Sequence, residues 1–384
     1  MVFDPTPFLT RTRLLNEYRS EIALAVEQHF PGPYPVQLEV NPSAGCNQNC
    51  HWCISENMHG DGRGQLDFNN IGVRQFFHDF KQHGGRFIGW SGGGEPTKHK
   101  AFDEALAFVS NEVGLPQGLM THGAFRKELR ESIARYCDWV RVSIDTHNAE
   151  RYRQRRGADA FTRVKENVKA LVASDAVTVG LNMNVAEWNK SEINDLYDLA
   201  CEWQVNYLQV RPTLPRHFSN RQGAADDDLN PKSIEQVLEA LSILAAKRMQ
   251  SDPALVVSLD KFAEMHMRTM RSDMDWGYKG CLAHELFVVL NYNGDLTVCM
   301  YHLDKDAFRF GNVYHQALQD IWLSQKRQEV VEFCENLDHG TLACQACCKG
   351  HEINKVLFSD CVLNIGSSTI PSRTGLRQYN DKIL

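Results

Sequence analysis

The stretch Gly45-Cys46-Asn47-Gln48-Asn49-Cys50-His51-Trp52-Cys53 carries three cysteines with the spacing Cys-x3-Cys-x2-Cys, directly after the strand-like run of residues 36–40. A [4Fe-4S] cluster usually has four cysteine ligands, so three thiolates on one tight loop leave one iron open. An open coordination position distinguishes a catalytic metal site from a closed structural one. We therefore predict that Cys46, Cys50 and Cys53 hold a catalytic [4Fe-4S] cluster.

A structural zinc knot, or simply three buried thiols, is the alternative interpretation of the same cysteines. Zinc sites usually bring their ligands as two pairs. Neither a His nor a Cys follows Cys53 at a suitable short distance to complete such a site. The cluster is therefore the preferred interpretation, and motifs later in the chain agree with it.

Composition excludes several classes of protein. The chain has 384 residues, of which 43% are apolar, as expected for a globular enzyme with one large and one smaller domain. The net charge of -7 argues against a nucleic-acid partner, which would require a basic surface. No stretch resembles a signal peptide or a membrane span, so we expect a cytoplasmic protein that has no membrane partner. Its 12 cysteines then indicate metal ligation rather than disulfides.

Short apolar runs alternate with helical patterns between residues 36 and 212. Strands are predicted at 36–40, 86–90, 118–121, 139–144, 177–185 and 207–210. Helices are predicted between them at 70–83, 100–113, 126–136, 160–173 and 191–203, and also at 12–29 and 232–249. This repetition implies an α/β fold with a parallel sheet and right-handed crossovers.

A second motif, Ser91-Gly92-Gly93-Gly94-Glu95-Pro96, follows the second predicted strand. Consecutive glycines let the backbone approach a ligand closely, and Glu95 supplies an anionic acceptor. A tight turn would explain the glycines equally well when they are considered alone.

Together, the cysteine loop and the GGEP sequence resemble the radical S-adenosylmethionine (SAM) superfamily. The resemblance implies a partial (β/α)6 TIM-like barrel whose βα loops share one mouth. It also implies that the methionine moiety of SAM occupies the open iron, and that an injected electron cleaves SAM to a 5'-deoxyadenosyl radical. In this family Gly93, Gly94 and Glu95 would hold the amino group of SAM, and Trp52 would lie close to its adenine.

Further candidates for SAM binding stand near the ends of predicted strands. Ser143 and Asp145 share a face by the two-residue strand period and resemble family residues that bind the ribose or carboxylate. A strand-end cap is the alternative role for both. Arg156 stands where related enzymes carry an arginine for the SAM carboxylate. Asn182 and Asn184 also share a face and are candidates for the adenosyl pocket. No side chain is identified as directly catalytic.

A second group of cysteines lies towards the C-terminus. Asn293-Gly294-Asp295 is predicted as a hairpin turn between strands at 286–290 and 296–298. Such a hairpin brings Cys281 and Cys299 together at its open end. Cys344 and Cys347 can close a four-thiolate site from the other side. A zinc ribbon is the structural alternative.

This C-terminal pattern resembles the SPASM and Twitch domains, which hold auxiliary iron-sulfur clusters. A full SPASM domain holds two such clusters, but here Cys348 follows Cys347 directly and the rest of the SPASM cysteine pattern is missing. The resemblance therefore favours one auxiliary [4Fe-4S] cluster, with Cys334, Cys348 and Cys361 left for a degenerate second site. The predicted domains are an N-terminal helical cap (1–34), the barrel (35–212), a linker and helical bridge (213–280) and the auxiliary-cluster domain (281–384).

The resemblance implies a radical SAM oxidoreductase acting on a small polar metabolite, such as a sugar or aminocyclitol. The auxiliary cluster would take an electron from the substrate radical, and flavodoxin or ferredoxin would reduce the first cluster. A peptide maturase that crosslinks or epimerises a ribosomal peptide is the alternative, and the short N-terminus counts against it. A non-catalytic iron-sulfur protein is a third possibility, although such a protein needs no open iron.

Overall fold

The computed structural model describes residues 17–27, 30–53, 64–213, 228–248, 254–257, 262, 278–338 and 349–358. The chain forms two compact units. The first unit contains Met1–Pro7, Val40–Leu66 and Ile88–Ser272, and the second contains Phe8–Glu39, Asp67–Phe87 and Asp273–Leu384. Four of the predicted metal or reserve ligands, Cys344, Cys347, Cys348 and Cys361, lie outside the described residues.

The first unit is built on parallel strands in the order β2-β3-β4-β5-β6-β7. Their bounds are Phe87–Trp90 (β2), Gln117–Thr121 (β3), Trp139–Ser143 (β4), Thr178–Val185 (β5), Tyr207–Pro212 (β6) and Ala254–Val257 (β7). The predicted strands are confirmed. Strand β7 falls in the predicted bridge, because a run of only four apolar residues carries too little periodicity to identify it.

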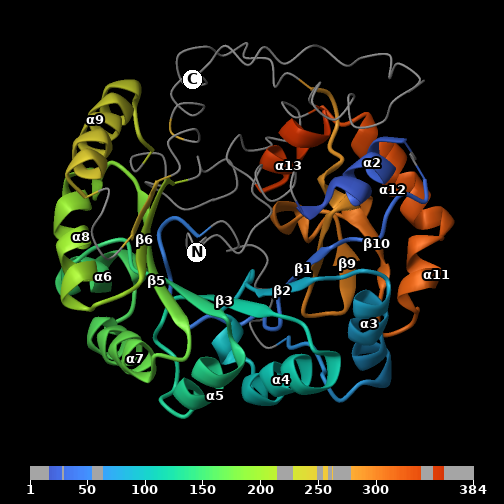
Figure 1. Cartoon of the computed structure of the whole chain (residues 1–384), viewed down its shortest axis with the longest axis horizontal. Coiled ribbons are helices and arrows are strands. Elements are labelled where there is room, and N and C mark those ends of the chain that lie inside the picture. The colour runs from blue at the N-terminus through green and yellow to red at the C-terminus, as the bar shows by residue number, and fades with distance from the viewer. Residues whose placement is uncertain are drawn as a thin grey trace. The chain divides into compact units, whose positions relative to one another are not determined.

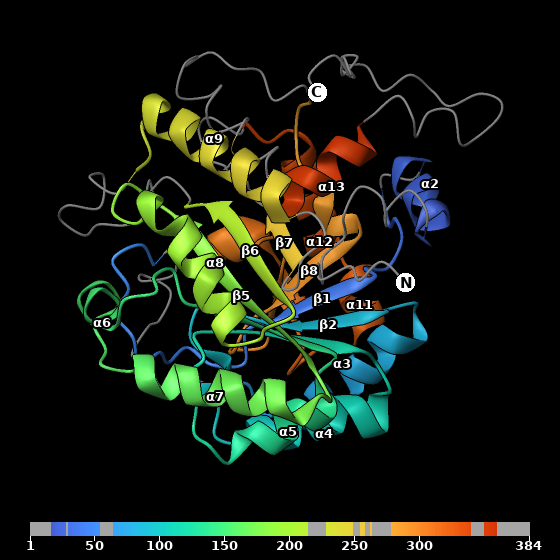
Figure 2. The ribbon, with the colours of Figure 1, turned by 60° about the vertical axis from the view of Figure 1, so that its left-hand side comes forward.

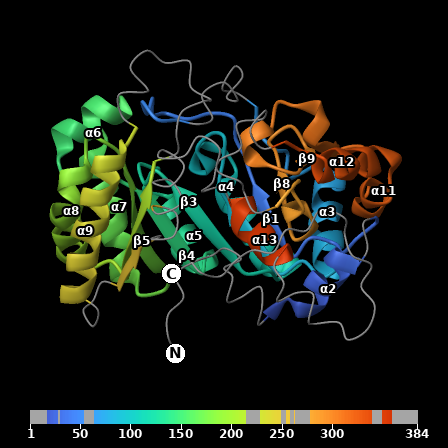
Figure 3. The ribbon, with the colours of Figure 1, turned by 90° about the horizontal axis from the view of Figure 1, so that it is seen from above.

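Helices cover the outer face of these strands, as Figures 1, 2 and 3 show for α7, α8 and α9. The bounds are Phe102–Phe108 (α4), Leu129–Tyr136 (α5), Ala149–Arg156 (α6), Phe161–Ser174 (α7), Ile193–Glu202 (α8) and Pro231–Arg248 (α9). Helix α4 continues into a π-helical turn, Val109–Val113, and short 3-10 turns occupy Pro96–Lys98 and Lys190–Glu192. Among the described helices, none is long and apolar enough to cross a membrane.

The two faces of the sheet differ in chemistry. The outer face is apolar: Val142 on β4 is fully buried, and a Cβ placed on Gly123 would lie 2.6 Å from Val142 Cγ1 and 3.0 Å from Val164 Cγ1 of α7. The alternate residues belong to the inner face, because successive side chains of a strand point to opposite sides. Ser143, Asn182 and Gln209 are aligned across β4, β5 and β6 on that inner face. The inner face is therefore polar at this level of the sheet, which suits a ligand rather than an apolar core.

Glycines make room for large rings on the inner face. A Cβ on Gly118 would lie 1.9 Å from the Trp139 ring, and one on Gly180 would lie 2.0 Å from the Tyr207 ring. Each glycine pairs with the aromatic residue of the neighbouring strand. Any side chain larger than glycine's would therefore clash with the neighbouring ring at these two strand positions.

The second unit contains the strand order β10-β9-β8-β1. The strands are Gln37–Val40 (β1), Phe287–Leu290 (β8), Asp295–Thr297 (β9) and Arg309–Asn312 (β10). The helices are Arg19–Glu27 (α2), Ile71–Gln82 (α3), Leu318–Trp322 (α11), Gln325–Glu335 (α12) and Lys349–Leu357 (α13), with 3-10 turns at Ala283–Glu285, Met300–His302 and Asp306–Phe308. Strands β8 and β9 form the predicted hairpin, and Gly294 adopts the left-handed φ of 84° that its turn requires.

A buried arginine holds several parts of the second unit together. Arg327 of α12 is fully buried, donates to Pro31 O at 2.6 Å and pairs with Glu285 at 3.4 Å. Its guanidinium carbon lies 3.6 Å from the centroid of the Trp322 ring. Burial lowers the pKa of Arg327 to about 10, and the charge of Glu285 opposes that shift. The pair joins α12 to the turn that precedes β8.

Candidate active site

The cysteine loop is fixed by backbone hydrogen bonds at several points. The Glu95 N–H donates to Gly45 O at 2.8 Å, which joins the loop to the glycine motif. The N–H groups of Asn49 and His51 donate to the carbonyls of Arg156 and Arg155, at 2.8 and 3.1 Å. The loop is therefore held between the end of β2 and the C-terminal end of α6.

None of the three predicted cluster ligands forms a disulfide within the described part of the chain. Cys46, Cys50 and Cys53 are all partly buried. Burial, followed by the charge of Glu95, raises the pKa of Cys46 to about 12, so in the protein alone this thiol stays protonated. A cation that stabilises the thiolate would reverse that preference. Within the described ranges, no group of three or more His, Cys, Asp or Glu side chains is arranged to hold a single metal ion. A cluster does not need such a group, because each of its thiolates binds a different iron. The loop thus fits a [4Fe-4S] cluster.

The glycine motif packs tightly on the cysteine loop. A Cβ on Gly94 would lie 2.4 Å from Ser43 O and 2.6 Å from Gly45 O. The Glu95 carboxylate is buried and accepts from the hydroxyls of Thr97 and Thr121 at 2.6 and 2.5 Å. Its other oxygen accepts from the backbone N–H of His122 at 2.9 Å. Glu95 therefore ties the glycine motif to the end of β3, and contact of Gly93, Gly94 and Glu95 with SAM stays a prediction.

We expect Gly94→Ala to displace the cysteine loop, because the new methyl group collides with backbone oxygens that have no rotamer to change. The variant should lose iron from the first cluster and most of its SAM cleavage, measured as 5'-deoxyadenosine under anaerobic conditions with a chemical reductant. Gly114→Ala is the control, because Gly114 has a left-handed φ of 70° but nothing within 4 Å of its Cβ position. Equal iron content in both variants would contradict the steric argument.

His122 is a residue of the site that the sequence did not identify. The Ala124 N–H donates to His122 Nδ1 at 3.0 Å, so Nε2 carries the proton and donates to Asn47 Oδ1 at 2.7 Å. Burial lowers the pKa of His122, while Glu95 opposes this shift, and the ring is neutral. It joins the end of β3 to the cysteine loop. Its position directly after a predicted barrel strand was the available signal.

Asp145 and Arg156, each predicted to contact SAM, are paired with one another in the structure. Arg156 Nη2 donates to the Asp145 carboxylate, and both side chains are buried. Asp145 has a left-handed φ of 62°, and its other oxygen accepts from the Asn184 N–H at 2.7 Å. Arg156 Nη1 donates to Gln48 Oε1 at 3.0 Å in the cysteine loop. Among the described residues Arg156 Nε has no acceptor, so one donor remains available to a ligand.

Trp52 stacks on Trp188, a residue that the sequence analysis did not identify. The ring centroids are 5.3 Å apart with an interplanar angle of 26°. The guanidinium of Arg156 lies 5.6 Å from the Trp52 ring, and that of Arg155 lies 5.2 Å from the Trp188 ring. The two indoles thus form an aromatic surface beside the cysteine loop, and its contact with adenine stays a prediction.

Buried amides of the first unit offer further ligand contacts. Asn182 is fully buried, and neither amide atom has a partner among the described residues. Asn41, directly after β1, is in the same situation. Such groups are costly unless a ligand satisfies them, which supports the SAM prediction for Asn182. Ser143 is its register neighbour, and its contact with SAM stays a prediction. Asn184 instead accepts from Arg211 Nε at 2.8 Å.

In the second unit, Cys281 and Cys299 flank the open end of the β8–β9 hairpin. Cys281 precedes the turn into β8, and Cys299 follows β9. Asn354 of α13 donates to Cys281 Sγ at 3.3 Å, and the carbonyl of buried Cys334 accepts from the Cys281 N–H at 2.8 Å. Because Cys344 and Cys347 lie outside the described residues, the four-cysteine site stays a prediction.

Comparison with known families agrees with this arrangement. Residues 40–200 match the family model of the radical SAM superfamily, and residues 281–348 match that of SPASM, an iron-sulfur cluster-binding domain. The chain therefore contains a radical SAM domain followed by a SPASM domain. The predicted partial barrel with a C-terminal auxiliary-cluster domain is confirmed at this level. The two domains also imply the predicted cofactors, namely SAM, its [4Fe-4S] cluster and auxiliary iron-sulfur binding.

Curated relatives are distant. A probable GTP 3',8-cyclase of Saccharolobus islandicus is 25% identical over 207 residues, which are 54% of this chain and 65% of that protein. The chain thus spans slightly less than two thirds of this relative. PqqA peptide cyclase of Xanthomonas oryzae is 25% identical over 336 residues, which are 82% of this chain and 84% of that protein.

Solved structures share the fold. SuiB of Streptococcus suis, bound to its precursor peptide SuiA, has a TM-score of 0.63 and 16% identity over 89% of this chain and 79% of its own. The enzyme anSMEcpe, with bound AdoMet and a peptide, has a TM-score of 0.60 and 18% identity over 83% of this chain and 88% of its own. At these identities the likeness establishes the fold alone.

Proposed function

We propose that this chain is a radical SAM enzyme that modifies a peptide. The observation that carries the proposal is the similarity to PqqA peptide cyclase, which extends over 82% of this chain and 84% of that relative. The similarity to the GTP cyclase covers only 54% of this chain. A relative that matches across most of both proteins is the better guide to the substrate class.

The prediction of a small-molecule substrate in preference to a peptide is wrong. PqqA peptide cyclase acts on a peptide, and the fold neighbours SuiB and anSMEcpe were both solved with one bound. The sequence argument failed because the cysteine and glycine motifs report the cofactors, which the whole superfamily shares. Substrate choice depends on loop side chains that no such motif describes.

The residues of the first unit have separable tasks in this proposal. When bound to Cys46, Cys50 and Cys53, the cluster together with SAM would supply a 5'-deoxyadenosyl radical that removes hydrogen from a substrate carbon. The Asp145–Arg156 pair keeps the cysteine loop in place and leaves Arg156 Nε as a donor for an anionic group. The buried Asn182 amide offers both a donor and an acceptor.

The second unit has a supporting role in the proposal. Cys281 and Cys299, together with Cys344 and Cys347, would hold an auxiliary [4Fe-4S] cluster. A peptide crosslink removes two hydrogen atoms from the substrate, so after the first abstraction one electron and one proton remain to be lost. The auxiliary cluster would accept that electron.

The test follows the abstracted hydrogen. Full-length reconstituted protein is incubated anaerobically with SAM, dithionite and tryptic peptides from cells grown in deuterated water. We expect deuterium in 5'-deoxyadenosine, measured by mass spectrometry, because the radical takes its hydrogen from the peptide. The low-molecular-mass metabolites of the same cells, freed of peptides, are the matched control pool and should give only unlabelled product. Label from the metabolite pool and none from the peptides would overturn the proposal.

A further inference from the structure

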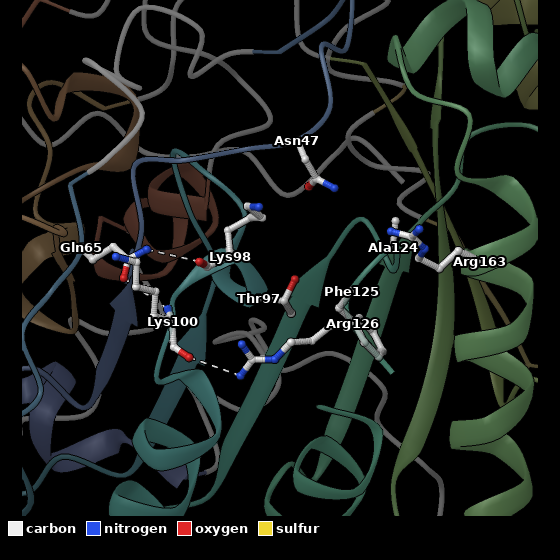
Figure 4. A pocket seen from close by; sticks show the side chains of 9 residues that line it. All are labelled: Asn47, Gln65, Thr97, Lys98, Lys100, Ala124, Phe125, Arg126 and Arg163. Atoms are coloured by element: carbon white, nitrogen blue, oxygen red, sulfur yellow. Dashed lines mark hydrogen bonds between the residues drawn. The ribbon is translucent and has the colours of Figure 1, made fainter. Parts of the chain in front are cut away.

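A cavity of about 590 Å³ lies in the first unit beside the cysteine loop. Figure 4 shows that its wall is formed by residues from several loops and by Arg163 in the first turn of α7. Asn47 of the cysteine loop and Thr97, two residues after Glu95, are part of this wall. The volume is within the range of pockets that hold drug-sized ligands, and exceeds what one small ion needs.

The lining of the cavity is cationic. Among the described residues, Lys98, Lys100, Arg126 and Arg163 line it, and no carboxylate does. Arg126 pairs with Asp103 at 3.2 Å, and both side chains are more than two-fifths exposed, so that this pair is weak. In the part of the chain that the structure describes, the other three cations have no carboxylate within ion-pair distance. Because the whole chain has a net charge of -7, this concentration of positive charge is local.

The backbone of the two lysines is held in place. Gln65 Nε2 donates to Lys98 O at 3.2 Å, and Gln65 Oε1 accepts from the Lys100 N–H at 3.2 Å. Arg126 Nη2 donates to Lys100 O at 3.2 Å, as the dashed line in Figure 4 shows. These contacts fix the backbone of Lys98 and Lys100 and place the Arg126 guanidinium beside it. A fixed backbone reduces the conformational entropy that these residues lose when they are ordered around an anion.

The cavity is joined to the cysteine loop by direct contacts. Asn47 in its wall accepts from His122 Nε2 at 2.7 Å. Thr97 in its wall donates to Glu95, whose N–H in turn donates to Gly45. A ligand in the cavity therefore touches the loop that carries the three predicted cluster cysteines.

We propose that this cavity binds acidic side chains of the peptide substrate, an inference that rests on the proposed peptide-modifying function. Lysine and arginine attract carboxylates, and the neutral Ala124 and Phe125 suit the aliphatic part of a peptide. The four cations arise from three segments, and the described lining residues include no glycine whose backbone amides would cradle a phosphate. The overall negative charge opposes a long polyanion such as RNA.

Binding is tested by fluorescence anisotropy with the full chain and no reductant, so that no turnover is needed. The probes are two labelled octapeptides, one alternating Glu with Ala and the other alternating Gln with Ala. We expect Lys98→Gln combined with Arg163→Gln to weaken binding of the Glu probe about tenfold, or about 1.4 kcal/mol, and to leave the Gln probe unchanged. Raising the salt concentration should weaken the Glu probe in the same way.

The matched control is Lys127→Gln combined with Arg135→Gln, which removes the same charge from exposed positions of the same unit that do not line the cavity. It should change the affinity less than twofold. Equal affinities of the two double variants, or equal binding of the two probes to the wild type, would overturn the proposal. The proposal would also be overturned if ATP or inorganic phosphate displaced the Glu probe from the wild type more effectively than unlabelled Glu peptide. That result would identify a phosphate site. A different result would refute the proposed function instead: the wild type binds the Glu probe through this cavity but modifies no peptide in the deuterium experiment.

Discussion

Replacing Cys46, Cys50 and Cys53 by alanine is expected to abolish formation of 5'-deoxyadenosine. The three thiols stand on one loop that is fixed on both sides by backbone hydrogen bonds, and nothing else in the described residues can replace them as a set. The product is measured by mass spectrometry after anaerobic reconstitution, with SAM and dithionite. The variant should also contain about four fewer iron ions per chain than the wild type, by the composition of one cluster.

Cys137→Ala provides the matched control for this experiment. Cys137 is a buried thiol in the same unit, at the end of α5, and burial raises its pKa so that it behaves as a small apolar side chain. This variant should keep its iron and its SAM cleavage. Persistent 5'-deoxyadenosine formation by the triple variant would refute the assignment of the cysteine loop.

Asp145→Asn is expected to destabilise the protein by about 3 kcal/mol, because it leaves the buried Arg156 without its counter-charge. Asparagine tolerates the left-handed backbone at this position, so the effect isolates the lost charge from backbone strain. Unfolding is followed by circular dichroism in urea. SAM cleavage should fall as well, because Arg156 and its carbonyl support the cysteine loop.

Asp175→Asn is the control, since Asp175 also has a left-handed φ, of 52°, but is exposed at the end of α7. It should change the free energy of unfolding by less than about 0.5 kcal/mol. Adding Arg156→Met to Asp145→Asn should recover part of the lost stability, because no unpaired buried charge then remains. If both Asp-to-Asn variants unfolded at the same urea concentration, the buried ion pair would not be the stabilising element we describe.

Much of the fold was predictable because its signals are local. The helices α7 and α8 and the strands β4 and β5 were predicted to within two residues, since apolar periodicity repeats within each segment. Helix α6 was missed because its sequence is almost entirely polar and only Tyr152 and Arg156 are buried. Strand β7 was missed because it is short and is recognisable as a strand only from its pairing with β6.

The amino-acid sequence alone determined the cysteine spacing, the glycine motif and hence the superfamily, because these are patterns within one or two loops. Tertiary structure alone decided which polar groups meet. His122 contacts Asn47 across 75 positions of sequence, and Gln48 contacts Tyr152 across 104. Asp145 pairs with Arg156 rather than remaining free for a ligand. Such contacts form only when parallel strands bring their carboxyl ends to the same edge of the sheet. The separation of two residues in the sequence does not predict whether they will be in contact there.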